Sequence, residues 1–155
     1  MPGHRIFIIL ENPKERIEYV QMLEGMGLLV DAVPDGSRAL EFMAAKKPDV
    51  VLADDTTPEF SSMDFLSNAL EILPTCKTII LAPEPRVDHA VNLMRAGALD
   101  YLIKPVDRRQ IELSIRRALV MGKKQAEPRE KDLGPSGKKN KNLVINQALS
   151  IKYSL

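Results

Sequence analysis

Five short apolar runs rich in β-branched residues alternate along the chain with stretches whose apolar residues recur at helical spacing. An apolar run without in-and-out alternation is typical of a parallel strand that helices cover on both faces. The runs predict strands over residues 5–10, 28–33, 48–54, 77–82 and 98–103. The stretches that follow them predict helices over residues 13–26, 37–45, 61–73, 83–95 and 107–119.

This strict alternation restricts the topology. Because consecutive parallel strands are joined by right-handed crossovers, such a series leaves little choice but one parallel sheet with helices on both faces. The expected class is therefore α/β, a doubly wound parallel sheet of five strands with five helices.

The 155 residues are enough for one domain with a sizeable core and too few for two of ordinary size. We expect the domain over residues 1–121 and a basic, partly disordered linker or tail over residues 122–155, where the apolar periodicity stops. The tail holds 8 Lys and Arg against 3 Asp and Glu. Its basic run could attract nucleic acid or an anionic surface, but a run without interleaved aromatic residues is more often a solvated linker. No helix-turn-helix pattern is present, and we expect no direct binding of nucleic acid by the domain over residues 1–121.

The cysteine content and the N-terminus indicate the compartment. Cys76 is the only cysteine, which excludes an internal disulfide and favours a reducing cytoplasm. The first apolar run is too short for a signal-peptide core or a membrane span, so we expect no membrane attachment.

Charged side chains stand where the expected strands end. In an open parallel sheet, ligands bind outside the carboxyl ends of the strands, and the sequence places Glu11, Asp54, Asp55 and Lys104 there. Side chains alternate along a strand, so Asp54 projects from the strand tip while Asp55 points to the other face or into the loop. Carboxylates that share a Mg²⁺, together with a lysine ammonium, are the parts needed to accept a phosphoryl group.

Three strings carry a resemblance to a known family: PDVVLADDTTP (48–58), DGSRALEFM (35–43) and LMRAGALDYLIKP (93–105). In this order and spacing they resemble the receiver domain of two-component response regulators, over residues 5–120. The resemblance implies a flavodoxin-like sheet with the strand order 2-1-3-4-5, and a signalling module rather than an enzyme. A sensor histidine kinase or phosphotransfer protein would donate a phosphoryl group. The domain would then change a surface made by its fourth helix, fifth strand and fifth helix, which binds a downstream protein, a fused output domain or a second copy.

The resemblance also implies which residues act. Asp54, four residues before Pro58, matches the phosphate-accepting aspartate, and Lys104 matches the lysine that contacts the phosphoryl group. The peptide bond from Lys104 to Pro105 is typically cis in relatives. Glu11 falls on the second member of the acidic pair that, with Asp54, holds Mg²⁺.

Two further positions match the switch residues of the family, and several positions depart from its pattern. Tyr101 matches the aromatic switch residue, but Ala82 stands where relatives have a Thr or Ser whose hydroxyl bonds the phosphoryl group and draws the aromatic ring inward. Leu10 replaces one acid of the metal pocket, so Glu11 must reach further. The other departures are Pro83 for a small residue, Ser62 for a glycine and Asp55 for an exposed apolar residue.

Each of these roles has a plainer alternative. Asp54 could be a solvated strand-end carboxylate, Lys104 a surface residue and Tyr101 a packing residue. Glu11 could simply favour the N-terminus of the next helix through the helix dipole. Asp55 could be an exposed loop carboxylate or a substitute metal ligand. The sequence gives His4 and His89 no ligand-spaced neighbours, which predicts no metal or acid–base role for them.

Two other functions also stay open. The residues Leu10 and Ala82 favour a pseudo-receiver that is never phosphorylated and binds its partner constitutively. A phosphatase of the haloacid-dehalogenase type also uses a strand-end aspartate, but it needs Asp-x-Asp, and Thr56 occupies the second position here.

Overall fold

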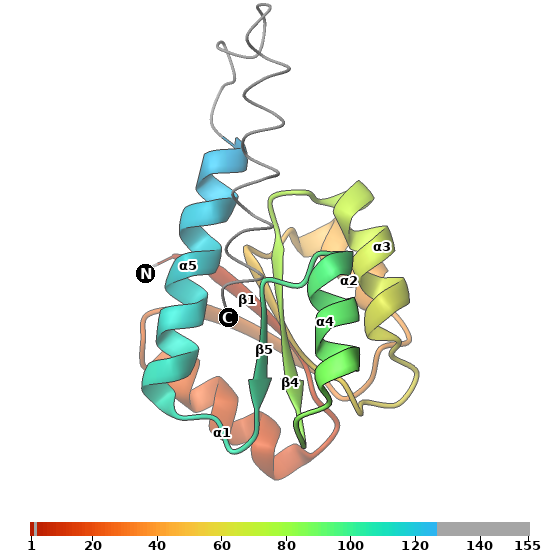
Figure 1. Ribbon diagram of the computed structural model, residues 1–155. Coiled ribbons are helices and arrows are strands. Elements are labelled where there is room, and N and C mark those ends of the chain that lie inside the picture. The colour runs from red at the N-terminus through yellow and green to blue at the C-terminus, as the bar shows by residue number, and fades with distance from the viewer. Residues whose placement is uncertain (2, 127–155) are drawn as a thin grey trace, which may run out of the picture. The chain divides into compact units, whose positions relative to one another are not determined.

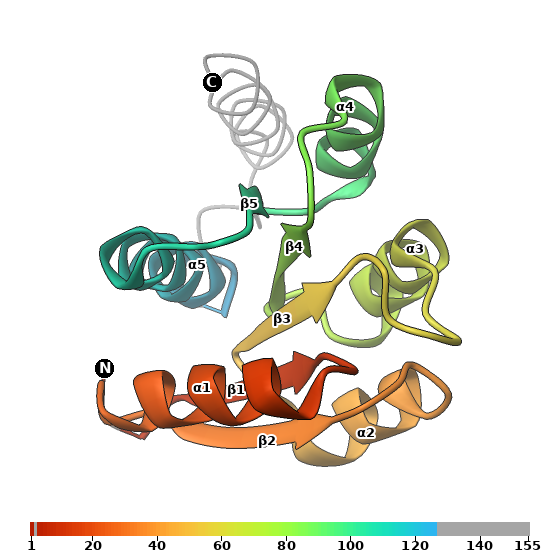
Figure 2. The ribbon, with the colours of Figure 1, turned by 90° about the horizontal axis from the view of Figure 1, so that it is seen from below.

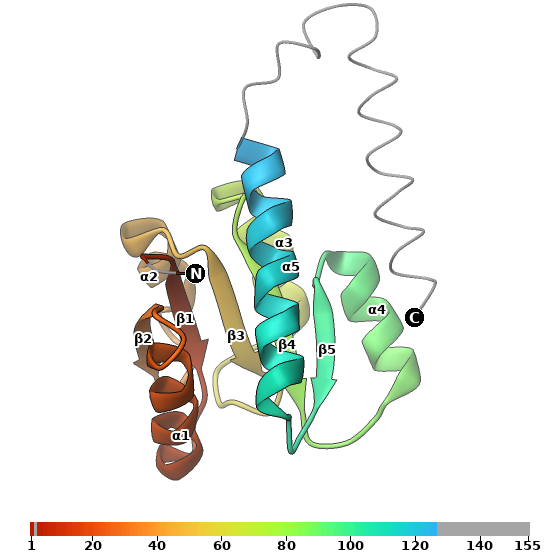
Figure 3. The same cartoon turned by 90° about the vertical axis from the view of Figure 1, so that its left-hand side faces the viewer.

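The computed structural model describes residue 1 and residues 3–126, in which five strands alternate with five helices (Figure 1). The strands are β1 (Arg5–Ile9), β2 (Leu29–Val33), β3 (Val50–Asp54), β4 (Lys77–Ala82) and β5 (Asp100–Ile103). The helices are α1 (Pro13–Glu24), α2 (Ala39–Lys46), α3 (Ser62–Ile72), α4 (Val87–Ala96) and α5 (Arg108–Ala126). All neighbouring strands pair in parallel, in the order β2-β1-β3-β4-β5 (Figure 3). The predicted class and strand order are confirmed.

Two of the helices begin where their capping residues indicate. The Asn12 side chain accepts a hydrogen bond from the Glu15 N–H at 3.0 Å, and Pro13 follows as the first residue of α1. The Ser61 hydroxyl accepts one from the Asp64 N–H at 3.3 Å and starts α3. These bonds satisfy N–H groups that a helix leaves free at its first turn.

Helices cover both faces of the sheet, as the view from below shows (Figure 2), and a separate core of buried side chains lies on each face. On one face, alternate residues such as Leu10 and Leu52 pack against α1 and α5. On the other face, residues such as Phe7 and Val51 pack against α2, α3 and α4. Because successive side chains of a strand point to opposite faces, the residues at each strand end are also divided between these two sides.

The last helix is longer than predicted. Helix α5 continues through Gly122 to Ala126, so the expected linker does not begin at residue 122. At Gly122 a Cβ atom would lie 2.6 Å from the Thr75 carbonyl oxygen, so the absence of a side chain allows α5 to approach the α3–β4 connection. The compact unit spans Met1–Gln125, and the expectations for residues 127–155 lie outside the described residues. No helix of the described part has the length and apolar character that crossing a membrane requires.

Candidate functional site

A lysine ammonium joins two carboxylates at the carboxyl end of the sheet. Asp54 is the last residue of β3 and is 5% exposed, and Lys104 follows the end of β5. The Lys104 Nζ donates to Asp54 Oδ2 at 2.5 Å and to Glu15 Oε2 at 3.0 Å. The structure therefore brings together two residues assigned from the sequence and adds Glu15, from the first turn of α1.

The second oxygen of Asp54 is held by the following loop. Both the backbone N–H and the hydroxyl of Thr56 donate to Asp54 Oδ1, at 3.0 and 2.8 Å. The hydroxyl of Thr57 donates to the Ile9 carbonyl at 3.4 Å and ties the same loop to β1. Asp54 thus has a fixed orientation, with one oxygen turned to the loop and the other to Lys104.

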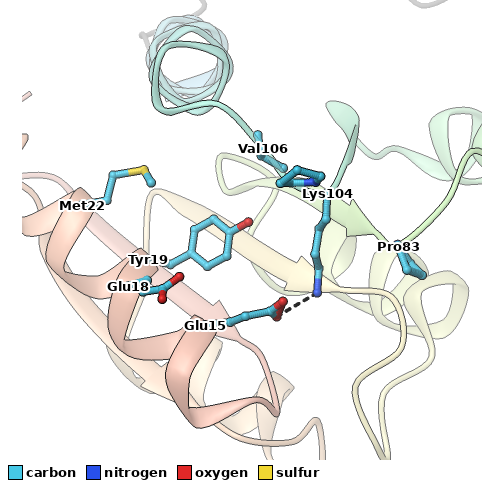
Figure 4. A pocket seen from close by; sticks show the side chains of 8 residues that line it. Glu15, Glu18, Tyr19, Met22, Pro83, Lys104 and Val106 are labelled. Carbon is cyan, nitrogen blue, oxygen red and sulfur yellow. Dashed lines mark hydrogen bonds and ion pairs between the residues drawn. The ribbon is translucent and has the colours of Figure 1, made fainter.

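A cavity of about 470 Å³ opens beside Lys104 (Figure 4). Figure 4 shows the Lys104 side chain extending to Glu15, with the Tyr19 ring on the α1 side. Burial raises the pKa of Tyr19, so its phenol stays neutral at physiological pH. The cavity is lined by Glu15, Glu18, Tyr19, Met22, Pro83, Lys104, Pro105 and Val106.

The charge of Lys104 is stabilised by its two partners. Burial by itself lowers the pKa of an ammonium, but the hydrogen bonds that Lys104 donates to Asp54 and then to Glu15 outweigh burial and raise its pKa above the usual value. The peptide bond to Pro105 is cis, as the resemblance implied. The ammonium therefore remains a positive charge next to Asp54 across the physiological pH range.

The acidic side of the site differs from the expectation for Glu11. Glu11 is exposed on the β1–α1 connection, where its carbonyl accepts a hydrogen bond from Arg16 at 2.8 Å. Leu10 is fully buried, and the register that pairs Ile9 with Ala53 brings it beside Asp54. Within the described residues, no group of three or more His, Cys, Asp or Glu is placed to hold a metal ion. Glu15 is a carboxylate near Asp54 that the sequence reasoning missed.

The two residues predicted to be switch residues, Ala82 and Tyr101, lie on the opposite face of the sheet. Ala82 ends β4 and is fully buried, and Tyr101 lies on β5 with its hydroxyl buried and without a hydrogen-bond partner in the described structure. Asp55 is not an exposed loop carboxylate: its side chain is 10% exposed and lies 2.6 Å from His89 Nε2. The prediction that His89 is isolated was also wrong, because nothing in the sequence pattern indicates a contact between residues 34 positions apart.

Comparison with known proteins identifies the family of this 2-1-3-4-5 sheet. The family model of the response regulator receiver domain matches residues 6–116. The chain belongs to this family. The resemblance inferred from the three sequence strings is confirmed, and the chain is a receiver domain of the two-component response regulator type.

Individual relatives agree with this assignment. The DNA-binding transcriptional regulator NtrC of Escherichia coli (strain K12) is 30% identical over 132 residues, which cover 84% of this chain and 28% of NtrC. The transcriptional regulatory protein ZraR of Klebsiella oxytoca is 34% identical over 99 residues, covering 64% of this chain and 22% of ZraR. The chain thus spans about a quarter of the length of these curated relatives.

A solved structure gives the same result. The response regulator receiver domain protein of Clostridium thermocellum superimposes with a TM-score of 0.73 at 28% identity, over 77% of this chain and 97% of that one. No observation in the comparisons favours the pseudo-receiver, and none supports a phosphatase of the haloacid-dehalogenase type.

Family membership also bears on the metal. Receiver domains generally bind Mg²⁺ in an acidic pocket and act as signalling modules that carry phosphorylation chemistry. The oxygen ligands near Asp54 suit Mg²⁺ in kind, since Asp54 and Glu15 both approach one cation, the Lys104 ammonium. The fit is incomplete in number, because Leu10 contributes no oxygen from its side chain.

Proposed function

We propose that Asp54 accepts a phosphoryl group from a sensor histidine kinase or a phosphotransfer protein and thereby switches a protein-binding surface. The observation that best supports this is the contact at 2.5 Å between buried Asp54 and Lys104. Lys104 also lines the cavity of about 470 Å³. An acceptor carboxylate, a fixed positive charge and room for a donor are what phosphoryl transfer to a protein requires.

The two oxygens of Asp54 have different roles in this proposal. Thr56 holds Oδ1, so Oδ2 is the nucleophile. Oδ2 forms a bond to phosphorus while the bond between phosphorus and the donor imidazole nitrogen breaks; the imidazole keeps that electron pair and takes a proton from solvent. The Lys104 ammonium moves from the carboxylate to the phosphoryl oxygens, where it neutralises negative charge.

Three carboxylates would hold Mg²⁺ in this proposal. Asp54 and Glu15 both contact the Lys104 ammonium, and Glu11 would be the third carboxylate, from the β1–α1 connection. Bound Mg²⁺ supplies further positive charge to the phosphoryl oxygens. Glu15 thus takes over part of the role that the family gives to the acid at the position of Leu10.

The recipient of the signal is a further part of the proposal. The relative NtrC is named as a DNA-binding transcriptional regulator, and this chain spans 28% of its length. We propose that a downstream protein or a fused output domain responds to the surface of α4, β5 and α5, which a second copy could also bind. We propose that the domain acts in the cytoplasm without itself binding nucleic acid or membrane.

Phosphorylation can be tested by mass spectrometry of the intact chain. Incubation with Mg²⁺ and acetyl phosphate is expected to add the mass of one phosphoryl group. Asp54→Asn should abolish the increment, whereas the matched control Asp55→Asn should retain it, because Asp55 contacts α3 and α4 on the other face. An unmodified wild-type chain, or an increment that persists in Asp54→Asn, would refute the proposal.

A further inference from the structure

The carboxylate next to the acceptor binds two helices. Asp55 Oδ1 accepts a hydrogen bond from the Ser62 hydroxyl at 2.6 Å, at the first residue of α3. Asp55 Oδ2 lies 2.6 Å from His89 Nε2, in the first turn of α4. The side chains of Asp55 and His89 are only 10% and 26% exposed. In this geometry both oxygens of Asp55 are used, and the pair is shielded from water enough to be a specific contact.

Tyr101 belongs to the same cluster. The rings of Tyr101 and His89 meet edge to face, with centroids 6.3 Å apart and planes at 83°. Burial and then the Asp55 carboxylate raise the pKa of Tyr101, and its buried hydroxyl lacks a hydrogen-bond partner in the described structure. The aromatic switch residue therefore contacts His89, while Ala82 offers it no hydroxyl.

The loop of Asp54 connects this cluster to the acceptor. Thr56 donates two hydrogen bonds to Asp54 Oδ1, and Asp55 lies between these two residues with its own N–H bonded to the Leu81 carbonyl at 2.9 Å. A phosphoryl group on Asp54 changes the charge and the geometry that Thr56 meets. Asp55 is bonded to Thr56 through the backbone, so a shift of Thr56 would reach the carboxylate that contacts Ser62 and His89 at 2.6 Å.

We propose that the Asp55–His89 pair carries the signal from Asp54 to α4 in this chain, in place of the hydroxyl that is absent at Ala82. The inference rests on the phosphorylation of Asp54 proposed above. It makes Asp55 and His89 positioning residues that act through α4 and Tyr101. The proposal requires that a change at Asp54 alters the strength of the Asp55–His89 contact. It also requires that loss of this contact reduces the structural change of α4.

The first experiment follows backbone amide resonances of the full chain on addition of beryllofluoride with Mg²⁺. In the wild type we expect shifts at residues 54–57 and along α4. His89→Phe keeps an aromatic ring against Tyr101 but deletes the nitrogen; it should retain the shifts at residues 54–57 and lose most of those in α4. Asp88→Asn removes an exposed charge from the same turn and should respond as the wild type does. An α4 response in His89→Phe equal to that of the wild type would overturn the inference.

A second experiment needs no phosphoryl group. Unfolding free energies of the wild type, Asp55→Asn, His89→Phe and the double variant give the coupling between the two residues. We expect this coupling to change when the cycle is repeated in the Asp54→Asn background; an unchanged coupling would count against the signal route. A changed coupling in a chain that never gains phosphoryl mass supports the route and refutes only the proposed modification. A gain of phosphoryl mass with an unchanged coupling supports the modification of Asp54 and refutes the signal route through Asp55 and His89.

Discussion

Restoring an acid at position 10 tests the metal pocket directly. Leu10 is fully buried against the α1 and α5 side of the sheet and lies beside Asp54. The substitution Leu10→Asp places a carboxylate where the family usually has one. Leu10→Asn is the matched control, since it has nearly the same shape and polarity without the charge.

The magnitude follows from burial and linkage. Losing a fully buried leucine side chain costs about 2–5 kcal/mol, and burying an unpaired polar group adds to this, so both variants should be destabilised by roughly 3–5 kcal/mol without metal. A ligand that binds only the native state stabilises it by about 1.4 kcal/mol when the free ligand concentration is about ten times the dissociation constant. Mg²⁺ should therefore restore roughly a third of the loss in Leu10→Asp and little in Leu10→Asn.

The assay is urea unfolding of both variants and the wild type, with and without Mg²⁺ at constant ionic strength. Equal recovery of Leu10→Asp and Leu10→Asn in Mg²⁺ would show that the new carboxylate does not meet the metal. A Leu10→Asp variant as stable as the wild type without Mg²⁺ would refute the assignment of position 10 to the core. Either result would remove the physical reason for calling the pocket incomplete.

Two further substitutions test the loop and the core. In Gly36→Ala the new Cβ would lie 2.6 Å from the Glu59 carbonyl oxygen, so we expect a loss of about 1–3 kcal/mol in urea unfolding, whereas the control Gly25→Ala, at a helical φ of −63°, should lose clearly less; equal losses would contradict the clash. Burial, and then the charge of Asp49, raises the pKa of the Cys76 thiol from its ordinary value of 9.0 to about 12. Above pH 9 the unfolded chain therefore releases a proton that the native state keeps. The free energy of unfolding should therefore fall as pH rises above about 9, by up to about 1.4 kcal/mol per pH unit, and Cys76→Ala should lack this component; parallel pH profiles of the two proteins would exclude it.

The elements of the fold were accessible from the sequence because each depends on nearby residues. The apolar runs at residues 50–54 and 77–82 are fully or almost fully covered strands, and such coverage requires helices on both faces. Asn12 and Ser61 cap their helices as the sequence indicates. The end of α5 was missed because Gly122 suggested a break, whereas the glycine lies within the helix at a point where a side chain would meet the Thr75 carbonyl oxygen.

The site was predictable only in part, because half of its contacts depend on how helices are rotated. Asp54 and Lys104 could be placed at the same edge of the sheet, because each stands at the carboxyl end of a parallel strand; their direct contact across β4 could not be read from the strand order. Glu15 meets Lys104 because the first turn of α1 faces the carboxyl edge of the sheet, and His89 meets Asp55 because α4 packs beside α3. Neither contact leaves a periodic pattern in the sequence.

The two neighbouring aspartates have different contacts because strand geometry directs their side chains to opposite faces of the sheet. The side chain at position 54 faces α1 and α5, so the side chain at position 55 faces α3 and α4. A shift of the strand register by one residue would place each of them on the other face. On the α3 and α4 side, Ala82 lacks the hydroxyl that the family uses to draw Tyr101 inward, and Asp55 provides a carboxylate that holds the His89 ring against the same tyrosine. The missing hydroxyl at Ala82 and the carboxylate of Asp55 thus lie on the same face of the sheet and concern the same residue, Tyr101. In the proposed route the coupling contact therefore lies at the end of β3, at Asp55, instead of at the end of β4, at the position of Ala82.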